Sequence, residues 1–242
     1  MSASRQEVAV IAGVGPGLGA SLARKFSREG CAIALLARSA DFLNALAEEL
    51  RQSGARVLPV PTDLTDAEAV GKAFALVRLE LGPISILVNH VGSGVWGGFN
   101  ELTAEGFRST WERCALAAFL CCKQVVPGML AHGGGSILFT GATSSIRGRN
   151  GAPAFSSAKF AVRGLADSLA RELWPQGIHV AHILVDGVID TAAVRAELTA
   201  GTSEPLLNPD DMAETYWALT RQKPGAWTFE LELRPPGEAF FV

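Results

Sequence analysis

Tyrosine is almost absent from this sequence, since Tyr216 is the only one among 242 residues. The residue four positions after it is Thr220, so no tyrosine is followed by a lysine one helical turn later. Lys159 instead has Phe155 four residues before it. The chain therefore cannot use a tyrosine and lysine at this spacing as an acid–base pair.

The sequence also lacks the features of metal and nucleic-acid sites. Its four cysteines form no Cys-x-x-Cys pair, and no histidine stands at a spacing that would complete a zinc site. We interpret the cysteines as free thiols in a reducing compartment and expect no metal. A net charge of −3 and a pI near 5.8 provide no basic field for phosphate backbones, so we expect a small-molecule ligand and no nucleic acid.

Long apolar runs are missing as well. Residues 1–7 contain no apolar signal core, and no later run approaches the ~20 apolar residues of a membrane span. We therefore expect a cytoplasmic protein with no membrane partner. Apolar residues make up 48% of the chain, and no repeat, linker or change in composition divides it, so residues 1–242 are predicted to form one domain.

What the sequence does contain begins with a glycine-rich turn. A short apolar run, Val8–Ala12, leads directly into a turn containing Gly13, Gly17 and Gly19, and a helical pattern starts at Leu18. Glycines let the backbone approach a pyrophosphate, and the start of the helix offers free N–H groups. The order of strand, glycine turn and helix favours dinucleotide binding over a purely structural turn.

The second apolar run indicates which dinucleotide would bind. Residues 32–37 are apolar and are followed by Arg38. An acidic residue at this strand end would hold the ribose hydroxyls of NAD, whereas an arginine suits the 2′-phosphate of NADP. The pattern favours NADP(H) over NAD(H), and the alternative is that Arg38 is a solvated surface residue.

Apolar runs and helical patterns alternate along the rest of the chain. The expected strands are residues 8–12, 32–37, 57–60, 84–89, 136–140, 179–185 and 227–233, and the expected later helices are residues 40–53, 65–81, 105–129, 155–174 and 208–222. Thr65 and Glu68 resemble a capping box that would begin the third helix. Short connections between alternating elements predict a doubly wound α/β domain with a mostly parallel seven-stranded sheet, whose ligands bind beyond the carboxyl ends of the strands. Helices 105–129 and 155–174 are apolar over more than one face, which indicates a subunit interface in a homodimer or homotetramer.

Taken together, these segments resemble the short-chain dehydrogenase/reductase family over nearly the whole chain. The matching positions are the glycines of the first turn, Asp63 and Leu64 after the third strand, Asn89 and Gly92 after the fourth, Lys159, and Gly187 with Thr191 after the sixth strand. The resemblance implies a Rossmann-type fold and a lysine that holds the nicotinamide ribose. The cofactor-binding residues are accordingly predicted to be Gly13, Gly17, Leu18, Gly19, Arg38, Asp63, Leu64, Asn89, Val91, Gly92, Lys159, Gly187, Ile189 and Thr191.

The catalytic positions of the family do not match. Its tyrosine, which acts as general acid or base, is Phe155 here, its serine falls on Ala142, and the asparagine of its fourth helix aligns with Cys114. His90 and Val91 occupy the middle of its Asn-Asn-Ala-Gly motif, and Asp186 precedes Gly187 where proline is usual. A benzyl ring cannot donate a proton, and loss of a positioned general acid typically lowers the rate by ~10²–10⁴.

Three kinds of group are candidates to replace the missing tyrosine. The hydroxyls of Thr143 and Ser144 follow Ala142 and would reach the reacting oxygen after a small shift of the loop, Lys159 would serve as an acid if burial lowered its pKa, and His90 has a suitable intrinsic pKa. We predict Lys159, Thr143 and Ser144 as the catalytic residues. Trp96 and Phe99 either shape an apolar substrate pocket or pack against their own loop, and Arg147, Arg149 and Asp190 are interpreted as solvated.

Two functions fit these residues. The first is an atypical oxidoreductase that transfers hydride between NADP(H) and a small carbonyl or alcohol substrate. The second is a non-enzymatic NADP(H)-binding sensor or partner subunit. Lys159, Asn89 and Thr191 would all frame the nicotinamide end, which a nucleotide sensor does not require, so the sequence favours the oxidoreductase.

Overall fold

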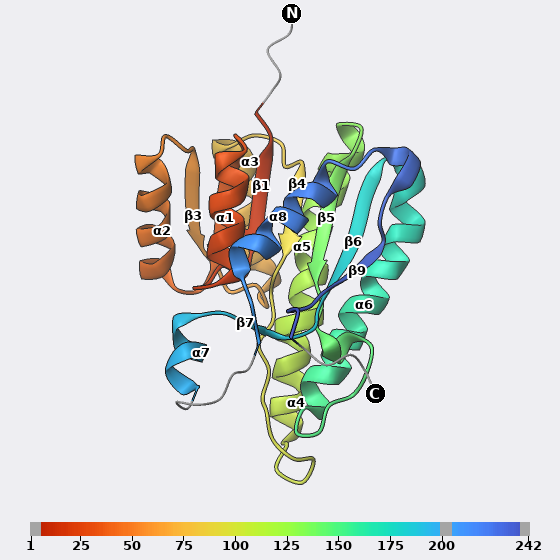
Figure 1. The fold of residues 1–242 in the computed structure, drawn as a ribbon. Helices are drawn as coiled ribbons and strands as arrows, with labels where there is room; N and C mark the ends of the chain where they lie inside the picture. Colours follow the sequence, from red (N-terminus) through yellow and green to blue (C-terminus); the bar gives the residue numbers. More distant parts are fainter. Residues whose placement is uncertain (1–5, 199–204, 238–242) are drawn as a thin grey trace, which may run out of the picture.

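Seven parallel strands form the central sheet of the computed structural model, which describes residues 6–198 and 205–237 (Figure 1). The strands are ordered β3-β2-β1-β4-β5-β6-β9, and every neighbouring pair is parallel, as expected for a doubly wound domain. They are β1 (Val8–Ala12), β2 (Ala32–Ala37), β3 (Val57–Pro61), β4 (Ile86–Asn89), β5 (Gly135–Thr140), β6 (Ile178–Val185) and β9 (Glu230–Leu233). From β1 the strand order runs outward to β3 on one side, and from β4 it runs outward to β9 on the other, so the order reverses between β1 and β4. The loops that follow these two strands flank the cavity described below.

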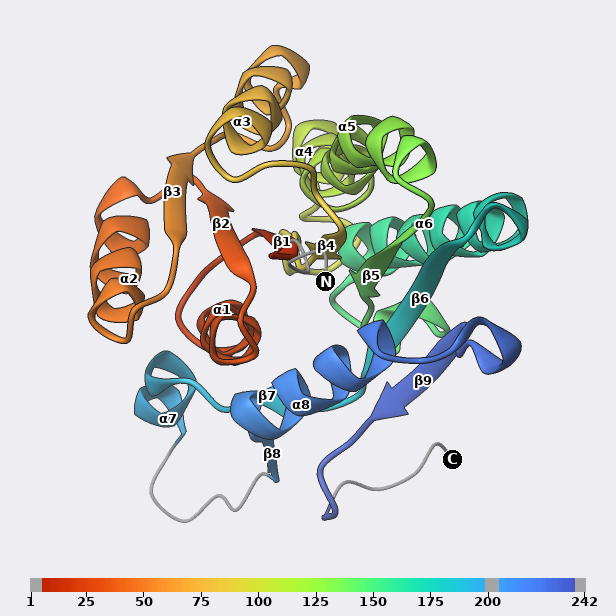
Figure 2. The same ribbon diagram turned by 90° about the horizontal axis from the view of Figure 1, so that it is seen from above.

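Helices cover both faces of the sheet (Figure 2). One layer contains α1 (Leu18–Arg28), α2 (Ala40–Gln52) and α8 (Pro209–Thr220), and the other contains α3 (Ala67–Glu80), α4 (Ala104–Trp111), α5 (Ala117–Ala131) and α6 (Pro153–Leu173). Strands buried on both faces must be apolar throughout, and all residues of β1 and β6 are buried. The continuous apolar runs of the sequence have this cause.

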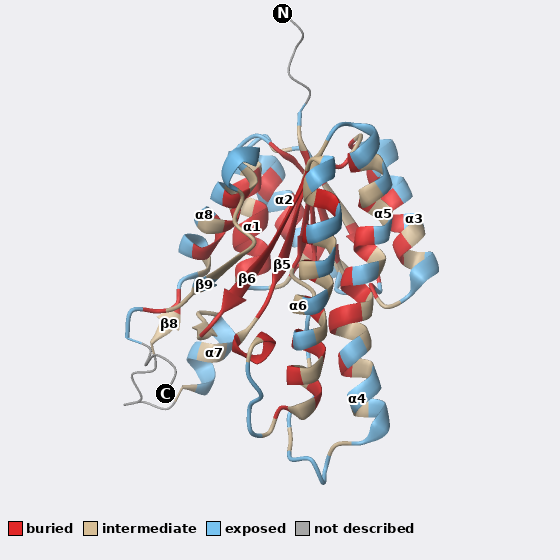
Figure 3. Ribbon diagram, turned by 90° about the vertical axis from the view of Figure 1, so that its right-hand side faces the viewer, coloured by how far each residue is buried: buried red, intermediate tan, exposed pale blue. Residues whose placement is uncertain are grey.

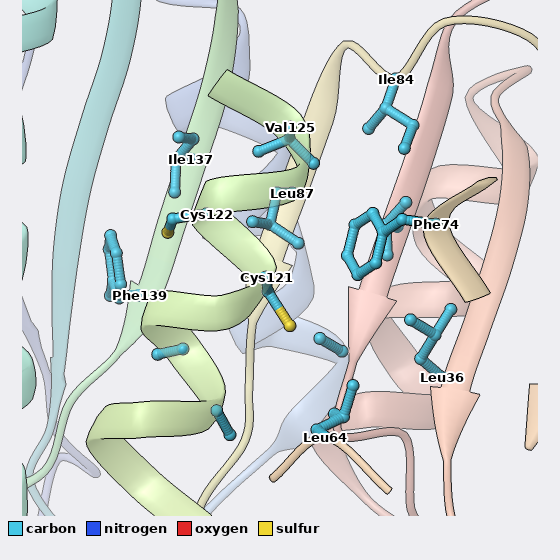
Figure 4. Packing of buried hydrophobic residues seen from close by; sticks show 14 of the residues in the cluster. Leu36, Leu64, Phe74, Ile84, Leu87, Cys121, Cys122, Val125, Ile137 and Phe139 are labelled. Carbon is cyan, nitrogen blue, oxygen red and sulfur yellow. The ribbon is translucent and has the colours of Figure 1, made fainter. Parts of the chain in front are cut away.

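Each helical layer encloses its own hydrophobic core. Figure 4 shows the core on the α3 and α5 side, where Phe74 and Cys121 lie among aliphatic side chains of the strands. All four cysteines are buried and free, as expected. Burial raises the pKa of the Cys122 thiol to about 12, so this thiol is protonated and unreactive at neutral pH.

Several boundaries differ from the expected ones. The predicted helix 105–129 consists of α4, a π-helical turn at Glu112–Leu116 and α5. Asp66, and not Thr65, caps α3, because its side chain accepts hydrogen bonds from the N–H groups of Glu68 and Ala69. The capping-box prediction was therefore wrong by one residue.

A small second sheet was not predicted. It pairs β7 (Val188–Ile189) with β8 (Leu206–Leu207), and α7 (Ala192–Glu197) follows β7. These elements lie beyond the carboxyl ends of the main strands (Figure 1). Strands of two residues carry too little hydrophobic pattern to be recognised from sequence.

The helical segment Ala104–Ala131 is long and apolar enough to cross a membrane, judged by length and composition alone. Core helices of soluble proteins meet the same test, and α5 packs against β4 and β5. Figure 3 shows exposed and half-buried residues along α4 and α6. The apolar composition of this segment therefore comes partly from core packing and partly from exposed side chains.

Candidate active site

A cavity of about 360 Å³ lies at the carboxyl ends of the strands, where the strand order reverses. Gly13 lines it with a φ of +93°, and a Cβ atom on this residue would lie 2.7 Å from the His90 carbonyl oxygen. Only glycine fits such a position, because a side chain would be strained and would collide with the backbone of the neighbouring loop. The glycine turn is thus packed directly against the loop that follows β4.

The start of α1 has no side-chain cap. Gly17 occupies the N-cap position with a φ of +114°, and no side chain of residues 6–198 or 205–237 caps the first helical N–H groups. A Cβ on Gly19 would lie 3.0 Å from the Val14 Cα, so the helix begins in close contact with the turn. Free N–H groups at a helix start attract anions, and this arrangement fits a pyrophosphate.

Three predicted cofactor residues surround the far end of this cavity. Arg38 is exposed and lines the cavity beside Asp63 and Leu64. The Asp63 carboxylate accepts hydrogen bonds from the N–H and hydroxyl of Thr65 at 3.0 and 2.7 Å, and these bonds hold its pKa below the usual range. An arginine and an ordered carboxylate therefore stand where a nucleotide ribose and base would lie.

Sequence reasoning missed the contribution of α4 to this cavity. Ser109, Glu112 and Arg113 line it from α4 and the π-helical turn. The residue pattern does not identify them, because a π turn changes which residues of the helix face the cavity.

A second cavity of about 550 Å³ adjoins the first, and His90 and Gly92 line both. Many of the predicted site residues meet in it, from segments far apart in sequence. They are Gly92, Thr143, Ser144, Lys159, Gly187, Ile189 and Thr191. Val91 lines the first cavity, whereas Leu18, Gly19 and Asn89 are buried behind the two cavities.

Thr191 lines the second cavity from the segment that follows β6. It caps α7 by accepting a hydrogen bond from the Val194 N–H at 3.2 Å. Its Cγ2 atom is so close to the glycine turn that a Cβ on Gly17 would lie 2.7 Å from it. The segment after β6 is therefore held against the start of α1, as a residue that contacts the nicotinamide end would need to be.

Lys159 lies on α6, lines the second cavity and is buried. Its Nζ donates a hydrogen bond to the Thr140 carbonyl oxygen at 2.9 Å. A Cβ on Gly92 would lie 3.0 Å from this Nζ, so the absence of a side chain at Gly92 leaves room for the ammonium. Burial lowers the pKa of Lys159, which makes it a stronger acid than a solvated lysine.

Phe155 lies one helical turn before Lys159, with its ring 5.6 Å from the lysine Nζ. The ring packs against Trp96 at 5.0 Å between centroids and against the backbone of Gly94. Ala142 lines the same cavity and has no donor. Two hydrocarbon side chains therefore stand where the family has its tyrosine and serine, and Trp96 joins them, whereas Phe99 is 81% exposed.

The two predicted hydroxyl donors already have hydrogen-bond partners. Thr143 donates to the Asp186 carboxylate, which also pairs with Arg234. The Ser144 oxygen accepts a hydrogen bond from the Ser156 hydroxyl at 3.4 Å. To donate to a substrate, Thr143 would have to leave a charged acceptor, whereas the bond from Ser156 does not use the Ser144 proton. Lys159 is the strongest acid of the three predicted catalytic residues, since it is an ammonium whose pKa is lowered by burial.

His90 is linked to the only tyrosine of the chain. Its Nδ1 lies 3.2 Å from the Thr140 hydroxyl, which lies 2.9 Å from the buried Tyr216 hydroxyl on α8. Each hydroxyl hydrogen has an acceptor when Tyr216 donates to Thr140 and Thr140 donates to Nδ1. The imidazole proton then stands on Nε2, so His90 can donate a hydrogen bond at neutral pH.

His90 is neutral near pH 7, because burial and the nearby Lys159 ammonium lower its pKa to about 4. Between pH ~6.5, the value for an unperturbed histidine, and pH 4 the unfolded chain binds a proton that the folded protein does not. Folding stability must therefore fall as the pH falls through this range, by ~3 kcal/mol for this residue. The buried His182, whose pKa burial also lowers to about 4, adds to the same loss.

We expect the His90→Asn variant to show a smaller loss of stability on acidification than the native protein, because one of these two uncharged histidines is removed. Urea unfolding at pH 7.5, 6, 5 and 4 measures it, and the two proteins should run parallel above pH 7. Equal slopes for both proteins between pH 6 and 4 would contradict the placement of His90 as a half-buried neutral group.

The sheet order and the cavity at its reversal define a doubly wound, Rossmann-type α/β protein. The model of the short chain dehydrogenase family matches residues 7–201, and the chain belongs to this family. A solved short-chain dehydrogenase from Rhodopseudomonas palustris is 35% identical with a TM-score of 0.82, and the match covers 96% of this chain and 100% of that chain.

Two further relatives are similar over nearly the whole chain. The alcohol dehydrogenase of Thermococcus sibiricus, solved in complex with 5-hydroxy-NADP, is 28% identical with a TM-score of 0.88, over 98% of this chain and 100% of that chain. Glycine betaine reductase of Emericella nidulans is 31% identical over 96% of this chain, although the match spans 19% of that much longer protein.

Proposed function

We propose that this protein is an atypical oxidoreductase that transfers hydride between NADP(H) and a small carbonyl or alcohol substrate. The observation that carries the proposal is the buried Lys159 ammonium, which lines the second cavity next to Gly92, a residue that lines both cavities. A nucleotide sensor would need the first cavity alone, whereas a redox enzyme needs a second one beside the nicotinamide end. The NADP analogue in the Thermococcus sibiricus relative supports the choice of cofactor.

The residues of the first cavity fit this cofactor. The glycine turn and the uncapped start of α1 would hold the pyrophosphate, Arg38 the 2′-phosphate, and Asp63 the adenine. Lys159 and Thr191 would hold the nicotinamide half at the boundary of the second cavity. The bound cofactor supplies or accepts the hydride.

The protein's own part in the reaction is to move a proton and exclude water. During reduction, the Lys159 ammonium donates its proton to the oxygen of the substrate carbonyl as the hydride reaches the carbon, and solvent then restores that proton. The lowered pKa of Lys159 favours this transfer. His90, which lines both cavities, keeps its Nε2–H as a neutral donor, and Phe155 with Trp96 excludes water from one side.

The alternative function is a non-enzymatic NADP(H) sensor or partner subunit. It is favoured by the hydrocarbon side chains of Phe155 and Ala142, which leave the two family donor positions empty of polar atoms. The two functions are separated by titrating the purified protein with NADPH and NADH, followed by fluorescence, and by then measuring NADPH oxidation with a panel of carbonyl compounds. Cofactor binding without turnover of any carbonyl would favour the sensor, and binding of neither cofactor would refute both.

We expect Arg38→Gln to weaken NADPH binding by about tenfold to a hundredfold and to leave NADH binding nearly unchanged, because the guanidinium would pair with the 2′-phosphate, which NADH lacks. Fluorescence titration of both cofactors measures the two affinities. Arg28→Gln is the matched control, since Arg28 is an exposed arginine at the end of α1 away from the cavity. Equal losses for NADPH and NADH would show that Arg38 does not select between them.

We also propose that the protein is a cytoplasmic homodimer or homotetramer. Large apolar side chains are exposed on the adjacent helices α4, α5 and α6, and a second subunit would cover them. They are Phe107, Trp111, Phe119, Leu130 and Phe160. Light scattering of the purified protein measures the state directly.

A further inference from the structure

Four side chains are stacked in series along one wall of the second cavity. The Lys159 Nζ lies 5.6 Å from the centroid of the Phe155 ring, and that ring lies 5.0 Å from the ring of Trp96 at an angle of 35°. The guanidinium of Arg149 lies 5.8 Å from the Trp96 ring on the exposed side. The series therefore runs from a buried ammonium through two aromatic rings to an exposed guanidinium.

Lys159 and Arg149, at the two ends of this series, have different roles. The Lys159 ammonium is bound to the Thr140 carbonyl and belongs to the reaction centre. Arg149 is anchored through its backbone, whose N–H donates to the Ser156 hydroxyl at 3.2 Å and whose carbonyl accepts from the Ala152 N–H at 3.2 Å. These bonds tie the Arg149 backbone to the start of α6, so its side chain stands at the outer end of the cavity.

The charge of the cavity has one sign. Of the described residues that line it, Arg149 and Lys159 carry a positive charge and none carries a carboxylate. Such a lining repels cationic substrates and attracts anionic ones. A substrate that carries a carboxylate would pair with Arg149, the lining cation that faces the opening.

The other residues that line the cavity restrict the shape and polarity of the rest of the substrate. Phe155 and Trp96 form one apolar wall, and Val188 and Val194 come from the segment after β6. The Gly94 backbone packs so tightly on Phe155 that a Cβ there would lie 2.8 Å from the ring, which holds this ring in place. An apolar body, preferably a flat ring, fits between the reaction centre and Arg149.

We propose that Arg149 is a specificity residue, and that the substrate is an apolar carbonyl compound with a carboxylate at the end away from the carbonyl group. We place the carboxylate away from the carbonyl, because the rings of Phe155 and Trp96 stand between Lys159 and Arg149 in this series of contacts. The inference rests on the proposed function for the carbonyl group, whereas the apolar body and the carboxylate follow from the cavity itself.

The test compares 4-acetylbenzoate with its methyl ester, which has the same ring and ketone but no charge. Isothermal titration calorimetry measures the binding of both compounds to the full chain, with and without saturating NADP⁺. We expect the acid to bind about tenfold more tightly than the ester. Arg149→Gln should remove this preference, Arg149→Lys should retain part of it, and Trp96→Leu should weaken the acid and the ester alike.

Arg171→Gln is the matched control, because Arg171 is an exposed arginine on the same helix as Phe155 that pairs with Asp167 outside the cavity. This variant should keep the full preference for the acid. Equal binding of the acid and the ester, no binding of either, or a preference that survives Arg149→Gln would overturn the inference.

The same titrations separate this inference from the proposed function. A protein that binds no NADP⁺ refutes the proposed function, while the cofactor-free titrations still decide whether Arg149 selects a carboxylate. A protein that binds NADP⁺ but does not prefer the acid keeps the proposed function and loses the specificity inference.

Discussion

Replacing Lys159 with methionine is expected to lower the rate of NADPH-dependent carbonyl reduction by ~10²–10⁴, because the variant loses the proposed proton donor. Lys159 is buried and its Nζ bonds the Thr140 carbonyl, so no neighbouring cation can take its place without repacking. Steady-state rates of NADPH oxidation, measured with the best carbonyl compound found by screening, provide the readout. Methionine has a similar length and keeps the core filled. It also removes the free-energy cost of burying the ammonium, which offsets the lost hydrogen bond to Thr140.

The matched control is Lys123→Met, since Lys123 is an exposed lysine on α5 away from both cavities. This variant should retain the native rate. Thermal unfolding of both variants separates a catalytic loss from a folding defect. A Lys159→Met protein that unfolds normally and turns over at the native rate would exclude Lys159 as the proton donor.

The second prediction concerns the two hydrocarbon positions. A protein carrying both Phe155→Tyr and Ala142→Ser is expected to reduce ordinary ketones ~10²–10⁴ faster than the native protein, because a phenol and a hydroxyl would then face the reacting oxygen. The new phenol would stand one helical turn from Lys159, whose ammonium lowers the phenol pKa and strengthens it as an acid. The two gains belong to one catalytic unit and are not expected to multiply.

Phe160→Tyr provides the control, since Phe160 is on the same helix and 44% exposed, outside the cavity. It should leave the rate unchanged. The size of the gain also distinguishes the two functions. Activity that rises from an existing level would support an atypical enzyme, whereas activity that arises only in the double variant would show that the native protein is a cofactor-binding framework without turnover. A double variant that folds and binds NADPH yet gains nothing would show that the loop after β5 does not present residue 142 to the substrate.

Local patterns were sufficient to predict the sheet and its order of elements. Buried parallel strands are apolar on both faces and therefore leave continuous apolar runs, and glycines mark the turn where backbone meets backbone at Gly13. The same patterns predicted a helix over residues 155–174, in which Phe155 stands four residues before Lys159. The absence of a tyrosine at this place could be read directly, because helical spacing alone determines it.

Boundaries and small elements were less predictable. A π-helical turn interrupts the predicted helix 105–129 and places Cys114 against the loop after β4, where its thiol lies 3.8 Å from the Ser93 carbonyl oxygen. A one-residue bulge in a helix depends on contacts with other segments and has no sequence period of its own. The pairing of β7 with β8 has the same origin.

The sequence by itself determined the fold, the glycine turn and the missing tyrosine, since each depends on neighbouring residues or on a regular spacing. Only the tertiary structure determines which groups around Lys159 can donate a proton. In the folded protein Thr143 donates a hydrogen bond to Asp186. His90 is connected through Thr140 to Tyr216, and Trp96 lies between Phe155 and Arg149. These partners come from loops that no local pattern brings together, and hydrogen bonding and burial, which depend on such partners, govern the acidity of each group.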